Sequence, residues 1–368
     1  MFIEIHMIQN FAPANLNRDD TNNPKDCDFG GVRRARISSQ CIKRAIRKEP
    51  VFSQMTNAPL GQRTRWLARS IKQLLMEAGK SEADAAEAAL GFFEELLGGM
   101  GKKDDDKERS TVIFFISEEE KKKIAEDILA QWDNKNNKKY ADLVKDYQKQ
   151  FKDRSSAPDI ALFGRMLAEN PALNLDAACQ VAHAISTHRV NMDIDFFTAV
   201  DDLQEQDESG SAMMGVTGFN SACFYRYMRL DWEQLVDNLG GDVDLASRTV
   251  EGFLHAAMRA VPSGKQNSFA AQNPPSFLLA VVRRDGMCWS LANAFEKPAS
   301  ATYEHSLVED SILKADAYWG RLNDFYNGDV QVFTALIQEG LDLPNLKDTV
   351  VQNAQDWVGA VIAQLAEV

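Results

Sequence analysis

Apolar and polar residues alternate over the start of the chain. Ile3, Ile5 and Met7 fall on one side of an extended segment, whereas Glu4 and His6 fall on the other. A period of two is typical of a half-buried β-strand. The sequence therefore predicts a first strand, followed by a long loop over residues 10–31 that is rich in Asn, Asp and Pro. Loops of this length are often functional.

The periodicity becomes helical after residue 37. On a helix capped by Ser38 or Ser39, the apolar residues Ile42, Ala45 and Ile46 share one narrow arc. The opposite arc holds only basic side chains, namely Lys43, Arg44, Arg47 and Lys48. Because the apolar arc must pack on a core, we expect the basic arc to face outward. A plain amphipathic surface helix would show the same pattern, so the helix alone does not decide its role.

The middle of the chain has two blocks of different character. Residues 63–78, 82–97, 118–133 and 140–152 have helical patterns, with an exposed break at 98–110 and a strand-like segment at 111–116. Residues 190–200 and 215–230 are rich in aromatic and β-branched residues and are joined by the polar segment 201–214. We predict a helical block and then a long β-hairpin.

The remaining residues return to a compact pattern. They indicate a helix at 247–260, a strand at 276–282, a hairpin turn at Asp285-Gly286, a returning strand at 287–292, and helices near 305–323, 329–338 and 351–366. With the first strand and helix, these elements can form one βαββαβ sheet. The prediction is an α+β, RRM-like (ferredoxin-like) fold in four parts, 1–58, 59–182, 183–230 and 231–368, with the two middle blocks as insertions.

Charge distribution points to a polyanion. The chain of 368 residues carries a formal charge of −13, yet residues 30–48 contain seven Lys or Arg and no acid. A basic island in an acidic protein is typical of a local site for a nucleic-acid backbone. Acidity elsewhere should confine nucleic-acid contact to this site.

Several function classes lack their signals. The five cysteines are scattered without a CxxC motif, and we read them as free thiols in a reducing cytosol. No membrane span or signal peptide is evident, so we expect a cytoplasmic protein. The sequence lacks GxSxG, HExxH, P-loop, dinucleotide-binding and paired RNP signatures. We predict no cofactor and no metal; the spacing of His183 and His188 favours a packed pair at a helix end over a zinc site.

Long segments resemble the CasC family, which supplies the repeated backbone subunit of the type I-E CRISPR surveillance complex, Cascade. They are NLNRDDTNNPKD (15–26), FGGVRRARISSQCIKRAIRK (29–48), AHAISTHRVNMDIDFFTAVDDLQEQ (182–206), FYRY (224–227), PSGKQNSFAAQNPP (262–275) and LANAFEK (291–297).

The resemblance implies an RRM-like palm, a helical fingers insertion and a β-hairpin thumb. It implies that copies stack head to tail along a guide RNA, beside other Cascade subunits, and that each thumb displaces one base so that the guide can pair with target DNA. It also implies no enzyme activity, because DNA cleavage belongs to a recruited helicase-nuclease.

An RNA-filament subunit must hold the backbone without reading sequence, because the guide varies. Our palm candidates for RNA contact are Arg36, Ser38, Gln40, Lys43, Arg44 and Arg47, of which the resemblance favours Ser38, Gln40, Lys43 and Arg44. The loop at 262–275 offers Gly264, Lys265, Gln266 and Asn267, with a capping turn as the alternative. Arg18 either serves the same groove or pairs with Asp19 or Asp20. Arg165 is a candidate for phosphate contact in the fingers.

Displacing a base needs an apolar wedge, because unstacking costs a few kcal/mol. The candidates are Met213, Met214, Phe196 and Phe197, of which we expect one phenylalanine to be core, and more weakly Met166. Lysines in the fingers are candidates for target DNA contact, namely Lys135, Lys138, Lys139, Lys145 and Lys149. A solvated helix face is the alternative for these, because Asp142, Asp146 and Asp153 are interleaved.

A second function class stays open. Related CRISPR backbone subunits use a thumb acid for metal-dependent cleavage of RNA, and Asp193, Asp195, Asp201, Asp202 and Asp207 crowd the predicted thumb. Regularly spaced fragments of complementary RNA in Mg²⁺ would favour this alternative.

Overall fold

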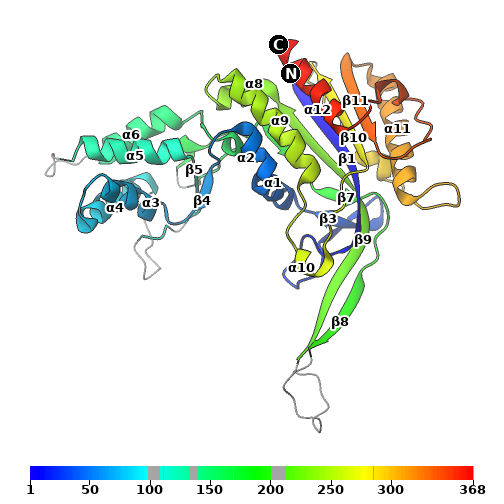
Figure 1. Cartoon of the computed structure of the whole chain (residues 1–368), viewed down its shortest axis with the longest axis horizontal. Coiled ribbons are helices and arrows are strands. Elements are labelled where there is room, and N and C mark those ends of the chain that lie inside the picture. The colour runs from blue at the N-terminus through cyan, green and yellow to red at the C-terminus, as the bar shows by residue number, and fades with distance from the viewer. Residues whose placement is uncertain are drawn as a thin grey trace, which may run out of the picture. The chain divides into compact units, whose positions relative to one another are not determined.

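A computed structural model describes residues 1–97, 108–110, 112–132, 140–168, 170–199, 213–284 and 286–367. The chain forms two compact units (Figure 1). The sheet unit comprises Met1–Phe52, Val181–Arg229 and Phe253–Val368. The helical unit comprises Ser53–Gln180 and Leu230–Gly252, and it therefore includes residues 231–252 of the predicted palm.

A large, mainly antiparallel sheet organises the sheet unit, in an α+β architecture. Its strand order is β11-β10-β1-β9-β7-β3-β2. The bounds are β1 Phe2–Ala14, β2 Asp26–Phe29, β3 Val32–Ile37, β7 Ala184–Ser186, β9 Met213–Asp231, β10 Phe277–Arg283 and β11 Val330–Leu336. Antiparallel pairing of β1 with β10 runs from Phe2 opposite Arg283 to Ile8 opposite Phe277. The predicted first strand is confirmed.

Helices cover both faces of this sheet (Figure 1), and all seven residues of the strand β10 are buried. One face of β10 presents Phe277, Leu279 and Val281 to a core that includes Trp319 of α11 (Leu307–Tyr326) and Leu291 of η2 (Leu291–Phe295). α12 (Ala354–Ala363) packs on β10 and β11. The unit also contains α1 (Ser39–Lys48), α10 (Gln266–Phe269), η3 (Lys347–Thr349) and η4 (Gln364–Glu367).

The helical unit has its own apolar core, in which Phe92, Phe93, Tyr147 and Phe151 are almost wholly buried. Its elements are β4 Gln62–Thr64, α3 Leu67–Glu77, α4 Glu82–Leu97, β5 Phe114–Ile116, α5 Glu118–Ala130, α6 Tyr140–Phe151, α7 Pro158–Phe163, η1 Pro171–Leu173 and α8 Trp232–Asn238. Among the described elements, β9 extends by two residues from the sheet unit into the helical unit, and three more elements cross between the sequence ranges of the two units, namely α2 Pro50–Thr56, β6 Cys179–Val181 and α9 Val243–Arg259.

Four expectations about local structure were wrong. The predicted helix at 329–338 is the strand β11, which pairs with β10, with Val332 opposite Val281. Residues 287–292 do not pair back on β10, because β11 takes that place and the Trp289 backbone N–H donates to the buried Glu4 carboxylate instead. The predicted loop at 10–31 contains β2 and the turn into β3, where Gly30 and Gly31 adopt φ of 59° and 73°. The helix predicted from residue 63 begins at Leu67, after β4.

All five cysteines are free thiols. Within the parts of the chain that the structure describes, no helix combines the length and apolarity needed to cross a bilayer.

A buried polar network lies on the α11 side of the sheet. Glu4 and Arg283 form an ion pair with both side chains fully buried. The Tyr227 hydroxyl donates to Glu4 at 3.0 Å, and the Arg283 guanidinium lies 3.6 Å from the Trp289 ring centroid. Burial raises the pKa of Glu4, an effect that its bonds to Arg283 oppose. The network fixes residues 287–291 against the sheet.

His6 makes the stability of this unit depend on pH. Its Nδ1 atom lies 2.8 Å from the Tyr225 hydroxyl, and burial lowers the pKa of His6 to about 3. Below pH 6.5 the unfolded chain binds a proton that the folded chain refuses, so stability falls as pH falls. Between pH 7 and pH 5 this one group should cost about 2 kcal/mol. Urea unfolding at both pH values should show that loss in the native protein and a smaller one in His6→Gln. Equal losses would show that His6 is not the titrating group.

Candidate nucleic-acid interface

The helix α1 presents a cationic face beside a tight N-terminal cap. Ser38 is the N-cap, and its Oγ accepts a hydrogen bond from the Cys41 backbone N–H at 3.4 Å. Ile42 and Ile46 are buried, as the arc predicted. Arg44 and Lys48 are exposed, whereas Lys43 and Arg47 are half-buried. The Ser38 side chain is itself 8% exposed, so its demonstrated role is to cap the helix.

Three segments that are distant in sequence meet in one hollow, which we call the α1 cleft. Its volume is about 690 Å³. Loop 16–22, α1 and the turn 261–264 form its walls. The cations of the cleft come from the loop and from α1, and they are Arg18, Arg44 and Lys48. Lys48 was not among the selected candidates, although its position one turn after Arg44 could have indicated it.

Gly264 explains how the turn and the loop come together. A Cβ atom at Gly264 would lie 2.4 Å from the Leu16 carbonyl oxygen and 2.7 Å from that of Asn15. Only glycine allows this approach without displacing backbone. The Asn15 side-chain amide donates to the carbonyl oxygens of Asn22 and Gly218, which ties the loop to β9. Gly264 therefore allows the turn 261–264 to pack closely against the loop 16–22.

The α1 cleft also contains the carboxylates Asp19, Asp20 and Glu49. Asp19 accepts hydrogen bonds from the backbone N–H groups of Thr21 and Asn23, and from the Thr21 hydroxyl. These bonds, led by that from Thr21, lower the pKa of Asp19, which stays charged. Arg18 donates to the Asn22 side-chain oxygen at 2.9 Å. Arg18 thus lines the cleft, and among the described residues it forms no ion pair with Asp19 or Asp20; its contact with RNA stays a prediction.

Part of the basic island is used inside the fold. Arg33 forms ion pairs with Asp26 at 2.6 Å and with Asp28 at 3.5 Å. Arg34 is fully buried and donates to backbone carbonyl oxygens, including that of Phe295 at 2.7 Å. The run before α1 therefore adds less outward charge than the sequence indicated, and the exposed cations are concentrated on the helix.

Arg36 lies in a separate half-buried setting. Its Nε donates to the Asp26 carbonyl oxygen, and its Nη1 lies 3.0 Å from His183 Nδ1. Burial and the charge of Arg36 lower the pKa of His183, which favours its neutral, accepting form. The expectation of a histidine pair at a helix end was wrong. His183 precedes β7, whereas His188 follows it and accepts from the Cys223 backbone N–H.

The turn at 262–270 fits the capping alternative in part. The Gln266 amide donates to the Pro262 carbonyl oxygen at 2.9 Å and accepts from Gln272 at 3.2 Å, so this side chain closes the turn. Lys265 has a left-handed φ of 48° as the N-cap of α10 and is half-buried. Asn267 and Gln40 are both exposed and accessible to a ligand.

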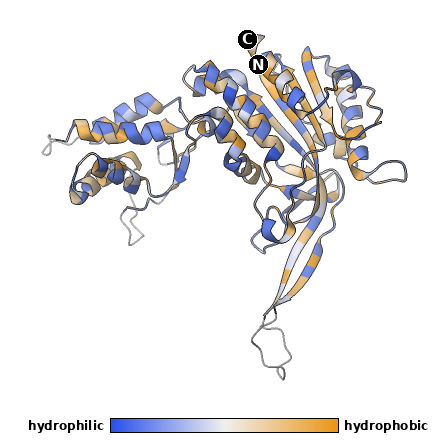
Figure 2. Ribbon diagram, viewed as in Figure 1, coloured by the Kyte–Doolittle hydropathy of each residue, from blue (hydrophilic) through white to orange (hydrophobic). Residues whose placement is uncertain are grey.

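The hairpin of β8 (Asp193–Ala199) and β9 carries four exposed apolar side chains on one face. Figure 2 shows hydrophobic residues interspersed with hydrophilic ones along its two strands. Phe196 pairs with Val216, Ile194 with Gly218, and Thr198 with Met214, which places them on one face. The exposed fractions are 74% for Ile194, 60% for Phe196, 68% for Met214 and 61% for Val216. Ile194 and Val216 were missed, although strand alternation with Phe196 could have indicated them.

The expectation that one phenylalanine lies in the core was wrong. Phe197 is 41% exposed, on the opposite face, where its ring covers Gly215. The Met213 side chain lies outside the described residues, as do Asp201, Asp202 and Asp207.

Arg165 is a structural residue, which corrects the predicted phosphate contact. It forms an ion pair with Glu120 in which the two side chains are 1% and 0% exposed. Its Nε also donates to the Leu173 carbonyl oxygen at 2.8 Å. No side-chain surface remains for an external phosphate. The next residue, Met166, is 85% exposed and lines a cleft of about 600 Å³ with Phe115 and Phe163.

Two of the five candidate lysines for DNA contact are described. Lys145 and Lys149 are exposed on α6, and their neighbours Asp142 and Asp146 are exposed as well. Lys135, Lys138 and Lys139 lie outside the described residues. The exposed charges of α6 fit both DNA contact and a solvated helix face, and the prediction stays open between these two.

Comparison with known proteins gave a matching family and similar solved structures. The sequence model of the CT1975-like protein family matches residues 3–361. One solved chain, from a structure described as "CRISPR RNA-guided surveillance complex, pre-nicking", has 30% identity and a TM-score of 0.84, covering 99% of this chain and 100% of that chain. A second, from a "CRISPR RNA-guided surveillance complex", has 27% identity and a TM-score of 0.66, covering 99% of each chain. A search of curated proteins gave no match.

Proposed function

Because the chain belongs to the CT1975-like protein family, we propose that it is an RNA-binding backbone subunit of a type I-E CRISPR surveillance complex, acting in antiviral defence. Copies assemble head to tail along the guide RNA, hold its phosphates without reading its sequence, and displace bases periodically so that the guide pairs with target DNA. The partners are the guide RNA, other copies, other Cascade subunits, target DNA and, indirectly, a helicase-nuclease. The observation that carries the proposal is the α1 cleft, in which three of the segments resembling the CasC family meet.

The order of strands and helices supports an RRM-like palm, but one in which RNA does not bind on the face of the sheet. The strands β1, β7, β9 and β10, with α1 and α9 between them, follow the order β-α-β-β-α-β. RRM domains stack bases on aromatic residues of the open sheet face. Here Tyr225, on the central strand β9, is 3% exposed and bonded to His6. We therefore assign RNA contact to the α1 cleft rather than to the sheet face.

The chemistry of the cleft suits backbone contact. Guanidinium and ammonium groups donate to phosphate oxygens, and such contacts carry no sequence information. Gln40 of α1 and Asn267 of α10 are further exposed amides, outside the lining of the cleft. The acids Asp19, Asp20 and Glu49 limit the net attraction, which suits a cleft that binds one strand in a defined position rather than any polyanion.

We propose that the protein is not catalytic. Of the thumb acids named for the ribonuclease alternative, Asp193 and Asp195 are described. They lie on the face of the hairpin opposite to that of Ile194 and Phe196. Among the described residues, no group of three or more His, Cys, Asp or Glu is placed to hold a metal ion. A direct assay decides: regularly spaced cleavage of complementary RNA in Mg²⁺, abolished by Asp195→Asn, would establish the ribonuclease alternative.

The apolar face of the hairpin predicts a specific loss of base displacement. In the double variant Phe196→Asp, Met214→Asp, folding should be unchanged, because both side chains are already solvent-exposed. Charged groups cannot replace a stacked base, so displacement should weaken by a few kcal/mol, on the order of 100-fold in population. Chemical probing of the bound guide should show that its periodic reactive bases become protected.

The matched control is Asp195→Asn, on the opposite face of the same strand. It should keep the native probing pattern. An unchanged pattern in the double variant, with RNA still bound, would rule out the hairpin as the wedge.

A further inference from the structure

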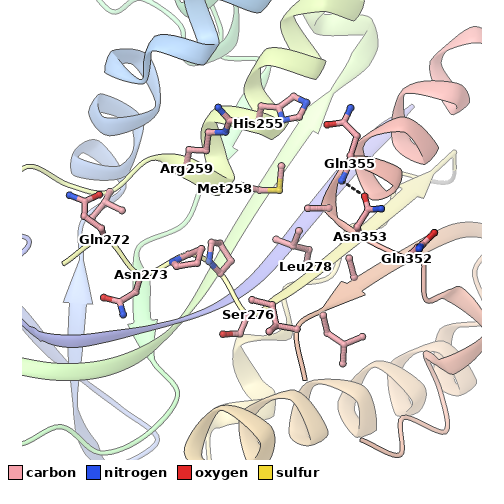
Figure 3. Close-up of a pocket in the computed structure, with 17 residues that line it drawn as sticks. His255, Met258, Arg259, Gln272, Asn273, Ser276, Leu278, Gln352, Asn353 and Gln355 are labelled. Carbon is pink, nitrogen blue, oxygen red and sulfur yellow. Dashed lines mark hydrogen bonds between the residues drawn. The ribbon is translucent and has the colours of Figure 1, made fainter. Parts of the chain in front are cut away.

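Figure 3 shows a second hollow, which we call the α12 cleft. It has a volume of about 690 Å³ and opens between the last turn of α9 and the start of α12. Val261 lines both clefts, which makes them neighbours on the sheet unit. This volume is within the usual range for small-molecule pockets, roughly 300–1,000 Å³.

The lining of the α12 cleft contains no acid. The chain has 54 Asp and Glu residues, yet none is among the 17 residues that line this cleft. The charged side chain in the lining is that of Arg259, which is exposed, and His255 lies beside it in Figure 3. Such a site repels no anion and offers a cation no counter-charge, so we expect its ligand to be neutral or negatively charged.

Its other side chains divide into an apolar floor and an amide rim. Met258, Leu278 and Leu336 provide a surface against which a flat apolar face can pack. Gln272, Asn273, Gln352, Asn353 and Gln355 line the cleft as well. Asn353 is occupied as the N-cap of α12, and Gln272 bonds Gln266. Within the described residues, the amides of Gln352 and Gln355 make no protein hydrogen bond, and both are exposed.

We propose that the α12 cleft binds one nucleotide of the RNA held in the α1 cleft. The base packs on Met258 and Leu278, its edge meets the amides of Gln352, Gln355 and Asn273, and its phosphate faces Arg259. An amide both donates and accepts, so it can rotate to suit any base edge, as a variable RNA requires. The proposal rests on the proposed function for the source of the nucleotide, and it adds a base-holding site to a surface otherwise assigned to phosphates.

Photo-crosslinking of the assembled full chain tests the proposal. A guide RNA carrying 5-iodouridine at one position at a time is bound, irradiated and digested with trypsin. We expect crosslinks at some positions on the peptide 249–259, which contains Met258. The variants Gln355→Glu and Asn273→Asp place a carboxylate in the cleft at nearly constant shape, and should each reduce that crosslink at least about fivefold. Gln331→Glu adds the same charge at an exposed position outside the cleft and should leave the yield unchanged.

The outcomes separate this proposal from the proposed function. Crosslinks to α1 with none in the α12 cleft would overturn the nucleotide site and leave the proposed function standing. Crosslinking of the cleft to a protein segment, from a second copy or another subunit, would also overturn it. If the chain binds no RNA, the proposed function fails, and calorimetric titration with uridine 5′-monophosphate decides the cleft alone: binding that Gln355→Glu abolishes supports the site, and absence of binding refutes it.

Discussion

Replacing Arg18, Arg44 and Lys48 by glutamine is expected to weaken guide-RNA binding about 50-fold at 0.15 M salt, equally for guides of any sequence. The three cations line the α1 cleft, and Arg18 and Arg44 are exposed like Lys48. Each phosphate contact with a single strand releases counterions and contributes about 0.7 to the slope of log K against log salt. Losing three contacts should flatten that slope by about 2. Filter binding over a salt series, with two unrelated guide sequences, measures both quantities.

A matched control removes two cations elsewhere. Lys145 and Lys149 are exposed on α6 of the helical unit, and changing both to glutamine should leave the guide-RNA slope unchanged. The account of the α1 cleft would be contradicted if the triple variant kept the native slope. The account would also be contradicted if the triple variant lost affinity to a degree that depended on the guide sequence, because phosphate contacts carry no sequence information.

The largest expected effect on stability lies in the helical unit. Glu120→Gln should lower the free energy of unfolding by about 3–5 kcal/mol, because it leaves the Arg165 guanidinium buried without its counter-charge. Both side chains are almost wholly buried, and the Tyr147 hydroxyl donates to the same carboxylate at 3.0 Å. Glutamine can still serve the capping box with Ser117 at the start of α5, so the loss reports mainly the ion pair.

Urea unfolding followed by circular dichroism measures this loss against a control. Asp244→Asn breaks the pair of Asp244 with Arg248, in which the two side chains are 83% and 35% exposed, and should cost less than about 1 kcal/mol. The double variant Glu120→Leu, Arg165→Met should recover much of the stability, because paired apolar side chains need no counter-charge. A small effect of Glu120→Gln would show that the buried ion pair with Arg165 is not what stabilises this unit.

The sequence predicted elements whose pattern is local. The helix α1 begins at its predicted cap because Ser38 and the arc of Ile42 and Ile46 both lie within ten residues. The strand β11 could not be separated from a helix in the same way. Its apolar residues fit both periods, and pairing with β10, almost fifty residues earlier in the chain, decides between them.

The site was predictable in its parts but not in its assembly. Three of its segments were identified separately, yet their meeting in the α1 cleft depends on contacts such as that of Gly264 with Leu16, about 250 residues apart. Arg165 shows the same limit. An arginine looks alike in sequence whether it is exposed or buried, and here the partner that buries it is Glu120, 45 residues away.

The hairpin shows a limit of alternation itself. Strand period assigns Phe196 and Phe197 to opposite faces, which is correct, and a core normally takes one face. Here both rings are exposed, because the described part of β8 pairs with β9 beyond the part of β9 that joins β7. Sequence period gives the faces of a strand, while the surrounding fold decides whether either face is covered.

The number of copies per particle as a function of guide length tests the central claim most directly. The chain is expressed with its partner subunits and with guide RNAs of increasing length, and each particle is weighed by native mass spectrometry. A backbone subunit predicts several copies per RNA and a stepwise increase as the guide lengthens. A single copy at every guide length, or particles that contain the partner subunits and RNA without this chain, would contradict it.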